Sequence, residues 1–399
     1  MRPVLLILTI CWLCPTILRA QGAAEMLDRM KAMEERIQAL EAELRALKGQ
    51  PAPAPAPSPP VQTPAGSLPY YGGASALAKI FNPDISVIGT FLGGVGNGAG
   101  RATPALEMRE TEVALQAIVD PYARADFFLS FRERGVELEE GYLTFPALPG
   151  GFQMKAGKMR AAFGKVNTLH LDSLPWTDRP LVTQNLLGGE EGISDAGVSI
   201  SRILPAPKQV FLEAIGQLYR GDTGELFRSF RRNDVAAIGR LRGYRDLSES
   251  TNLDLGVSYG RGRNPLEPSA VTQLYGADVT LRWRPLRRSI YRSFIGRGEW
   301  IWSRAGERGD ATRAFGYYVS GEYQLARRWF LGGRFDRSDR PAERLLRDTG
   351  GSLLLTYRPS EFSQIRGQLR RTRYGERVTA NELLFQLQFS LGVHGAHPF

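Results

Sequence analysis

The chain has 399 residues, a formal net charge of +10 and 43% hydrophobic residues. Beyond the first twenty residues no apolar run approaches the roughly 18 residues that a membrane-spanning helix needs, which excludes a helical membrane protein. Both cysteines, Cys11 and Cys14, lie within those first twenty residues. We therefore expect the exported chain to have no disulfide and no cysteine-based metal site or nucleophile.

Residues 1–20 have the pattern of a secretory signal peptide. Arg2 is followed by an apolar run at 4–18 and by Ala20 near the expected cleavage point. Cleavage removes Arg2 and Arg19, so the net charge falls by two, from +10 to +8. An exported basic protein does not meet the genome, and we expect no nucleic-acid partner.

Residues 21–48 are predicted to form a periplasmic coiled coil. Apolar residues occupy the a and d positions of a heptad repeat from 23 to 47, and the g and e positions carry charges that are complementary between parallel chains. The alternative is an amphipathic helix that lies on the protein's own surface. The residues expected to join copies of the chain are Met26, Met30, Met33, Ile37, Leu40, Leu44 and Leu47.

Residues 49–81 are predicted to be a linker. They contain a repeated Pro-Ala sequence, which cannot continue a helix or a sheet and favours a semi-rigid polyproline spacer.

Residues 82–399 alternate apolar and polar side chains in about sixteen segments separated by tight turns and longer polar loops. This pattern predicts an all-β fold, an antiparallel transmembrane β-barrel of about 16 strands, preceded by the short α-helical coiled coil. The predicted strands begin near Asp84, Leu106, Tyr122, Val136, Gly151, Ser194, Lys208, Asp234, Thr251, Val271, Ile290, Arg313, Arg328, Gly350, Phe362 and Val378.

The last segment alternates cleanly, with apolar residues at every second position from Leu383 to Val393, and the chain ends on Phe399. We expect the apolar face to meet outer-membrane lipid. A terminal aromatic residue is typical of bacterial outer-membrane barrels, whose assembly machinery recognises it. The predicted assembly signal consists of Phe389, Leu391, Val393 and Phe399.

The face opposite the apolar one carries many charges. Because unpaired ions are costly in a dry core, this face predicts a water-filled lumen. Part of the charge is expected to form ion-pair ladders along the wall. The predicted pore-lining residues are Arg124, Arg282, Arg297, Arg334, Arg366 and Arg370.

Residues 161–193 form the longest loop, the third on its side of the predicted barrel. In porins, which this chain resembles, the corresponding loop folds inward and narrows the channel. We expect the same of this loop, with its charges opposed to the arginine-rich wall. The alternative is a loop that lies on the outer rim or latches a neighbouring subunit. The candidate constriction residues are Lys165, His170, Asp172, Asp178, Arg179, Glu190 and Glu191.

Three histidines invite a metal or catalytic interpretation. His394 and His397 offer two ligands without a third, and His170 lies in a different loop, so no set of nucleophile and base can be assembled. We expect no metal site, no cofactor and no enzymatic activity.

The signal, the coiled coil, the proline-rich spacer and the barrel ending on Phe399 together resemble the trimeric outer-membrane porins with a periplasmic coiled coil, in the phosphate-selective and dicarboxylate-type superfamily. Segments 82–89 and 386–399 are also similar to an uncharacterised family labelled zinc-regulated TonB-dependent outer membrane receptor. Such receptors have a folded plug domain, for which this chain has only the coil and the spacer.

These resemblances imply a homotrimer in the bacterial outer membrane that allows passive diffusion of small hydrophilic, anionic solutes. The alternatives are a non-conducting anchor or scaffold, and a plugless, receptor-like uptake protein.

Overall fold

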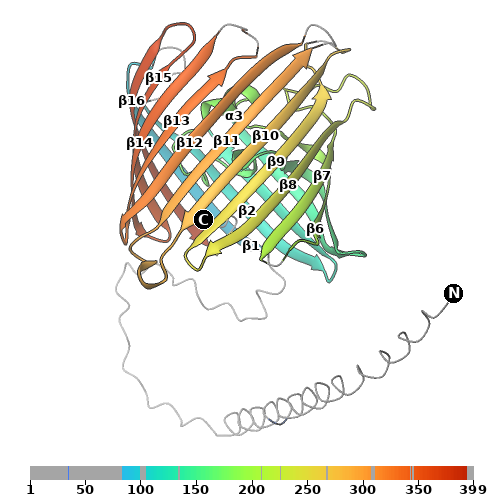
Figure 1. The fold of residues 1–399 in the computed structure, drawn as a ribbon, viewed down its shortest axis with the longest axis horizontal. Coiled ribbons are helices and arrows are strands. Elements are labelled where there is room, and N and C mark those ends of the chain that lie inside the picture. The colour runs from blue at the N-terminus through green and yellow to red at the C-terminus, as the bar shows by residue number, and fades with distance from the viewer. Residues whose placement is uncertain are drawn as a thin grey trace, which may run out of the picture. The chain divides into compact units, whose positions relative to one another are not determined.

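The computed structural model describes Glu35 and residues 83–392, apart from 99–104, 134, 208, 225, 267, 307–310, 342 and 344–345. Within 83–392 the chain forms one closed β-barrel (Figure 1). The chain divides into two compact units, Met1–Gly72 and Gly73–Phe399, and the barrel belongs to the second. Its strands are β1 (Asp84–Gly96), β2 (Leu106–Asp120), β3 (Ala123–Arg132), β4 (Gly135–Leu148), β5 (Phe152–Arg160), β6 (Ser194–Leu204), β7 (Val210–Tyr219), β8 (Ala236–Ser248), β9 (Thr251–Arg263), β10 (Val271–Trp283), β11 (Phe294–Gly306), β12 (Thr312–Ala326), β13 (Trp329–Asp339), β14 (Arg347–Ser360), β15 (Ser363–Arg373) and β16 (Thr379–Gly392).

Each strand pairs antiparallel with its neighbours in the chain, and β1 pairs with β16 to close the ring. The predicted barrel of about sixteen strands is confirmed. The predicted strand starts also agree closely, and the largest difference is between residue 290 and Phe294. No helix within the described residues is long and apolar enough to cross a membrane.

The two rims differ as the sequence predicts. The rim at the start of β1 has links such as 121–122, 249–250, 327–328 and 361–362. One link on this rim, 284–293, is longer than the predicted tight turn because it contains the short 3-10 helix η2 (Leu286–Arg288). The opposite rim has the longer loops, and 161–193 is the longest.

The outer surface of the barrel is apolar, with aromatic side chains near both rims. Towards the long-loop rim, Trp302 stacks on Phe315 with ring centroids 5.2 Å apart, and Tyr259 lies 5.2 Å from Tyr275. Near the other rim, Trp329 lies 4.6 Å from Tyr357. Aromatic girdles that flank an apolar band are typical of barrels in lipid. Between them, exposed side chains include Leu255, Val257, Val319, Leu331, Leu353 and Leu355.

Two β-bulges change which side chains face the interior. In β2, Thr90 of β1 pairs with Glu110 and Phe91 pairs with Met108, so Arg109 is the extra residue. In β4, Phe128 of β3 pairs with Glu140 and Leu129 pairs with Leu138, so Glu139 is the extra residue. A bulge places two consecutive residues opposite one and re-aims a side chain. Both inserted residues contact groups inside the barrel.

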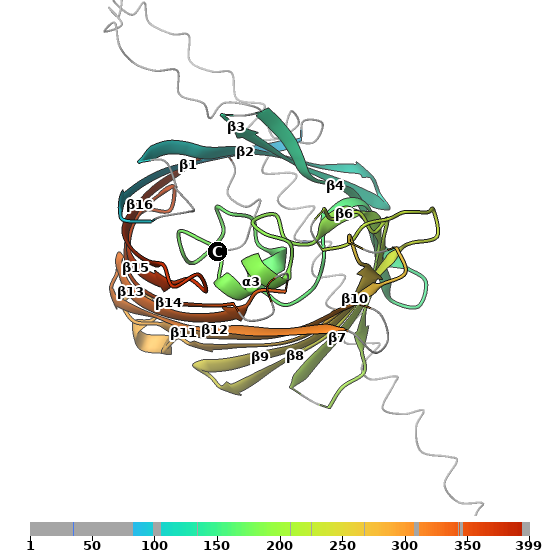
Figure 2. The ribbon, with the colours of Figure 1, turned by 90° about the horizontal axis from the view of Figure 1, so that it is seen from above.

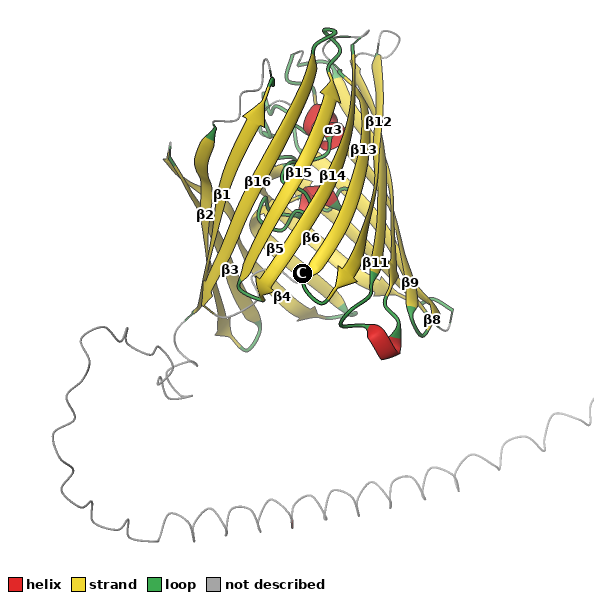
Figure 3. Ribbon diagram, turned by 90° about the vertical axis from the view of Figure 1, so that its left-hand side faces the viewer, coloured by secondary structure: helices red, strands yellow, loops and turns green. Residues whose placement is uncertain are grey.

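The lumen contains the long loop and its helix α3 (Leu181–Leu186) (Figures 2 and 3). A second short helix in this loop is η1 (Val166–Thr168). The inward folding predicted for residues 161–193 is therefore what the structure has. We call these residues the lumen loop.

The predicted signal peptide, coiled coil and linker lie outside the described residues, except for Glu35. The same holds for Val393, Phe399, His394 and His397.

Candidate functional site

The two ends of the lumen loop meet and are joined by one buried side chain. The amide of Ala161 donates to the carbonyl of Ile193 over 2.8 Å. The Nδ2 of Asn167 donates to both of these residues' carbonyls, and its Oδ1 accepts from the amide of Ile193. Gly192 has φ +67°, and a Cβ there would lie 2.3 Å from the Asn167 Oδ1. This neck fixes the loop relative to β5 and β6.

The middle of the loop packs an apolar core against the wall. Trp176 lies edge-on to Tyr318 of β12, with ring centroids 5.1 Å apart. The guanidinium of Arg334 lies 5.0 Å from the centroid of the Trp176 ring. The loop residues in this core include Phe163, Val166, Leu171, Leu174, Trp176, Val182, Leu186 and Leu187, and the wall residues include Tyr219, Ile238, Leu274, Ile301, Tyr318 and Leu354. Phe227, from the loop between β7 and β8, belongs to the same core. Part of the predicted water-filled interior is therefore closely packed, because apolar wall residues such as Leu354 face inward where the loop covers them.

Asp178 is the main charged anchor of the loop. Its carboxylate accepts hydrogen bonds from Arg334 Nη2 at 2.9 Å, from Arg370 Nη1 at 2.8 Å and from Gln368 Nε2 at 2.6 Å. Burial alone would raise the pKa of Asp178, but the two guanidinium groups outweigh burial and hold the pKa well below its usual range. The carboxylate is therefore ionised over the whole physiological range.

Further polar contacts of the loop reach strands around the circumference. They link Ala162 to Gln217 of β7, Lys165 to Asp254 of β9, Val166 to Glu299 of β11, Leu181 to Asp336 of β13, Asn185 to Asp348 of β14, Leu174 to Arg366 and Thr177 to Gln368 of β15, and Asp172 to Gln388 of β16. The loop is therefore attached to strands on several sides of the lumen and not on one side alone.

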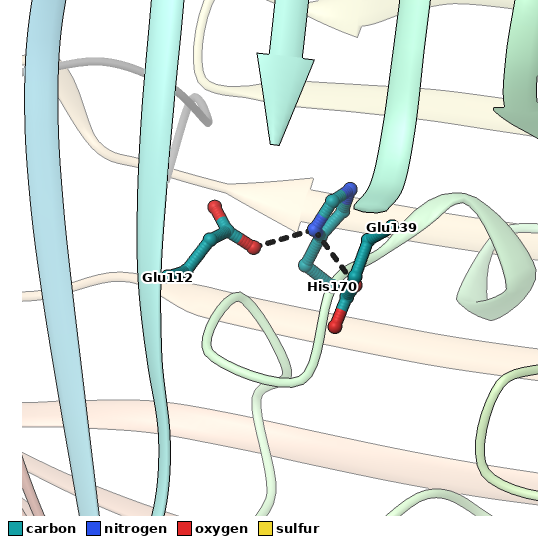
Figure 4. Close-up of side chains that lie close together, drawn as sticks. All are labelled: Glu112, Glu139 and His170. Atoms are coloured by element: carbon teal, nitrogen blue, oxygen red, sulfur yellow. Dashed lines mark hydrogen bonds and ion pairs between the residues drawn. The ribbon is translucent and has the colours of Figure 1, made fainter. Parts of the chain in front are cut away.

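On the opposite side, His170 joins the loop to β2 and β4 (Figure 4). Its Nδ1 lies 2.6 Å from Glu112 Oε2 and 3.2 Å from Glu139 Oε2, and its Nε2 lies 2.8 Å from Glu140 Oε2. The imidazole is completely buried. Burial lowers the pKa of His170, but the hydrogen bonds to the three carboxylates prevail and raise it well above its usual value.

The bulge in β4 creates half of this cluster. Strict alternation would send either Glu139 or Glu140 outward, whereas the bulge lets both face His170. Sequence reasoning missed these residues and Glu112. The alternation of apolar residues in this segment does change, from even positions (Val136, Leu138) to an odd position (Leu143). That change in the sequence pattern could have indicated the bulge.

The predicted constriction residues fall into two groups. His170, Asp172, Asp178 and Arg179 are buried, while Glu190 and Glu191 keep 63% and 40% of their side chains exposed. Lys165 is three-quarters buried against Asp254. Arg179 donates to the carbonyls of Val166 and Leu169 in its own loop, and burial lowers its pKa to about 9, so it stays cationic at neutral pH.

The predicted pore-lining arginines also separate. Arg334, Arg366 and Arg370 are on the inner wall, but their guanidinium groups bind the lumen loop. Their side chains are largely buried, and the most exposed of the three, Arg370, keeps 13% of its side chain accessible. Arg124 pairs with Asp126 and keeps 49% of its side chain exposed, while Arg282 keeps 38%. Arg297 is partly exposed.

Of the predicted assembly residues that the structure describes, Phe389 and Leu391 are exposed on the outer face, with 38% and 61% accessibility. The predicted oligomerisation residues, Met26 to Leu47, lie outside the described part of the chain.

No family model matches the sequence. A sequence relative is an uncharacterized protein of Aquifex aeolicus, which is 30% identical over 331 residues, or 72% of this chain and 69% of the relative. The chain belongs to the same family as this protein.

The fold is that of outer-membrane porins, as three solved structures illustrate. The anion-selective porin of Comamonas acidovorans superposes with a TM-score of 0.54 at 9% identity, over 77% of this chain and 98% of the porin. OprB of Pseudomonas putida has a TM-score of 0.54 at 10% identity, over 79% and 95%. The trimer form of Vibrio cholerae OmpT has a TM-score of 0.52 at 9% identity, over 77% and 99%.

Replacing Asp178 by Asn should release the middle of the lumen loop. The change leaves Arg334 and Arg370 buried without this counter-charge, and breaking a buried ion pair costs about 3–5 kcal/mol. We expect amide hydrogen exchange in α3 to become about a hundredfold faster or more, measured by mass spectrometry on the folded barrel. Asp222→Asn, at an exposed position, is the matched control. Equal exchange in both variants would contradict the role of Asp178.

Proposed function

We propose that this protein is a channel of the bacterial outer membrane through which small hydrophilic solutes diffuse passively, anions in preference to cations. The observation that carries the proposal is a polar, charged inner wall within an apolar outer belt, with a loop held across the lumen. The apolar belt suits lipid, and a closed ring leaves no unpaired strand edge in it. The similarity in fold to porins supports the same interpretation.

The charge balance on one side of the lumen supports an anion preference. Asp254 of β9 faces three cations: Lys165, Arg242 at 2.9 Å and Arg282 at 3.9 Å. Arg242 also lies 3.8 Å from Glu213, so these five groups sum to +1.

Arg297 adds to this positive charge. It lies on β11 and pairs with Thr280 of β10, two residues from Arg282 on the same face of β10. Arg282 and Arg297 both retain exposed surface. A wall of positive potential raises the local concentration of anions and lowers that of cations.

Reversing the charge of both Arg282 and Arg297 to Glu should shift the channel towards cations. The measurement is the reversal potential of single channels in a KCl gradient across a planar bilayer. Arg371→Glu with Arg373→Glu carries the same charge change on the outer face of β15 and should leave the reversal potential unchanged. An unaltered potential in the Arg282 and Arg297 variant would remove these residues from the permeation path.

The extensive packing of the lumen loop favours a second candidate, a non-conducting anchor or scaffold. The apolar core around Trp176 and the anchors at Asp178 and His170 hold the loop from several sides, as a closed barrel would require. The two functions differ in one measurable property, the passage of ions through the native protein.

Single-channel recording of the native protein decides between these candidates. A channel should give discrete conductance steps. Replacing residues 169–187 by a short Gly-Ser segment, which keeps Asn167 and the neck, should enlarge these steps several-fold. Shortening the rim loop at 264–270 is the control and should leave the conductance within experimental scatter. A native protein that never conducts, while the loop-shortened variant does, would establish a closed barrel and refute free diffusion.

We also infer that the protein self-associates, as a trimer. The heptad pattern of residues 23–47 supports parallel association, and the trimer form of Vibrio cholerae OmpT has a similar barrel. Chemical cross-linking of the exported chain should trap three copies, and deletion of residues 25–48 should reduce this yield. Exclusively monomeric protein in both cases would contradict the inference.

A further inference from the structure

The cluster around His170 brings metal-ligating side chains together from three parts of the chain. Glu112 comes from β2, Glu139 from β4 and His170 from the lumen loop, and one potential ligand atom from each lies within 4.8 Å of the others. These residues are exposed by 1%, 2% and 0%. Figure 4 shows both carboxylates directed at the same imidazole nitrogen, Nδ1.

The surroundings of the three side chains hold them in the orientation that a metal site needs. Glu140 lies 2.8 Å from His170 Nε2, so it can accept the proton of that nitrogen and leave Nδ1 as the ligand atom. Histidine ligands of metals usually donate a hydrogen bond from the N–H of their other ring nitrogen in this way. Glu139 accepts from Arg160 at 2.7 Å and from Arg132 at 2.9 Å, which fixes its carboxylate.

One oxygen of a neighbouring buried carboxylate, that of Glu110, accepts no hydrogen bond from the described residues. Glu110 is fully buried two residues before Glu112 on the same face of β2. Its Oε2 accepts from Arg132 Nη2 at 3.2 Å, and that nitrogen also donates to Glu139. Within the described part of the chain, Glu110 Oε1 has no hydrogen-bond partner. Leaving a buried carboxylate oxygen unsatisfied is costly, and a cation would satisfy it directly or through a bound water.

We propose that Glu112, Glu139 and His170 form a binding site for a divalent transition-metal cation. One imidazole nitrogen and two carboxylate oxygens suit cations such as Zn²⁺, Co²⁺ or Mn²⁺ better than Ca²⁺ or Mg²⁺, which take oxygen ligands.

The spacing of the ligand atoms is close to that of a metal site. Bonds of about 2.1 Å in tetrahedral geometry place ligand atoms roughly 3.4 Å apart. The distance from Nδ1 to Glu139 is already 3.2 Å, and the distance to Glu112, 2.6 Å, has to widen by less than about 1 Å.

A cation here would tie the lumen loop to two strands of the wall on the side opposite Asp178. The bulge in β4 supplies Glu139, and the position of the loop supplies His170, so the site exists only in the folded barrel. Binding to the folded form alone stabilises it by mass action. The site does not depend on whether the lumen conducts.

The test is metal titration of the full exported chain, purified without a histidine tag and stripped with a chelator. We expect one Co²⁺ per chain, with the visible absorption of a nitrogen- and oxygen-ligated cobalt ion, and displacement of Co²⁺ by Zn²⁺. His170→Gln and Glu112→Gln should each weaken the affinity at least tenfold, while the band shift of the folded barrel on gels shows that each variant is assembled.

The chain has only three histidines, which provides a sharp control. The double variant His394→Asn with His397→Asn should bind Co²⁺ as the native protein does. Binding that disappears in this double variant and survives in His170→Gln would overturn the proposal. The proposal would also be overturned if the metal-free native protein bound none of Co²⁺, Zn²⁺ and Mn²⁺ at submillimolar concentration. This second test does not depend on the folding of any variant.

Discussion

The pairing of β1 with β16 is the interaction on which the rest of the structure depends. Ser86 to Gly96 align with Gly392 to Glu382 in one antiparallel ladder, which completes the ring of strands. In lipid, unpaired backbone groups cost several kcal/mol each, so a sheet is tolerated there only when it has no free edge. Closure also creates an interior that lipid cannot reach. Charged and polar side chains can line that interior, and a loop can fold into it.

The lumen loop is held in this interior by two kinds of force. Its apolar residues around Trp176 gain by leaving water, as in any protein core. Its charged residues would lose by the same burial, and they are accommodated because the wall presents partners of opposite sign. Asp178 meets Arg334 and Arg370, and His170 meets Glu112, Glu139 and Glu140. The interior is thus neither an empty tube nor a wholly apolar core.

Two bulges supply charges that strict alternation would have sent elsewhere. Arg109 in β2 donates to the carbonyl of Thr177 in the loop, and Glu139 in β4 lies against His170. A bulge costs one residue of ladder pairing and gains an inward side chain. Both bulges lie on the side of the barrel where His170 meets the wall. The candidate metal site and the attachment of the loop on this side of the barrel therefore both depend on bulges.

The sequence by itself determined the elements of the barrel. Alternation at positions such as Leu383, Phe385 and Phe389 is a property of each strand alone, because successive side chains point to opposite faces. It predicted about sixteen strands, their starts and their outward faces, and the length of residues 161–193 together with the resemblance to porins predicted an inward loop. Tertiary structure alone decided which charges meet. Asp178 and Arg370, or His170 and Glu139, are far apart in the chain, and their contact depends on strand register, on the bulges and on closure of the ring. For this reason Arg366 and Arg370, expected to line open water, instead hold the lumen loop.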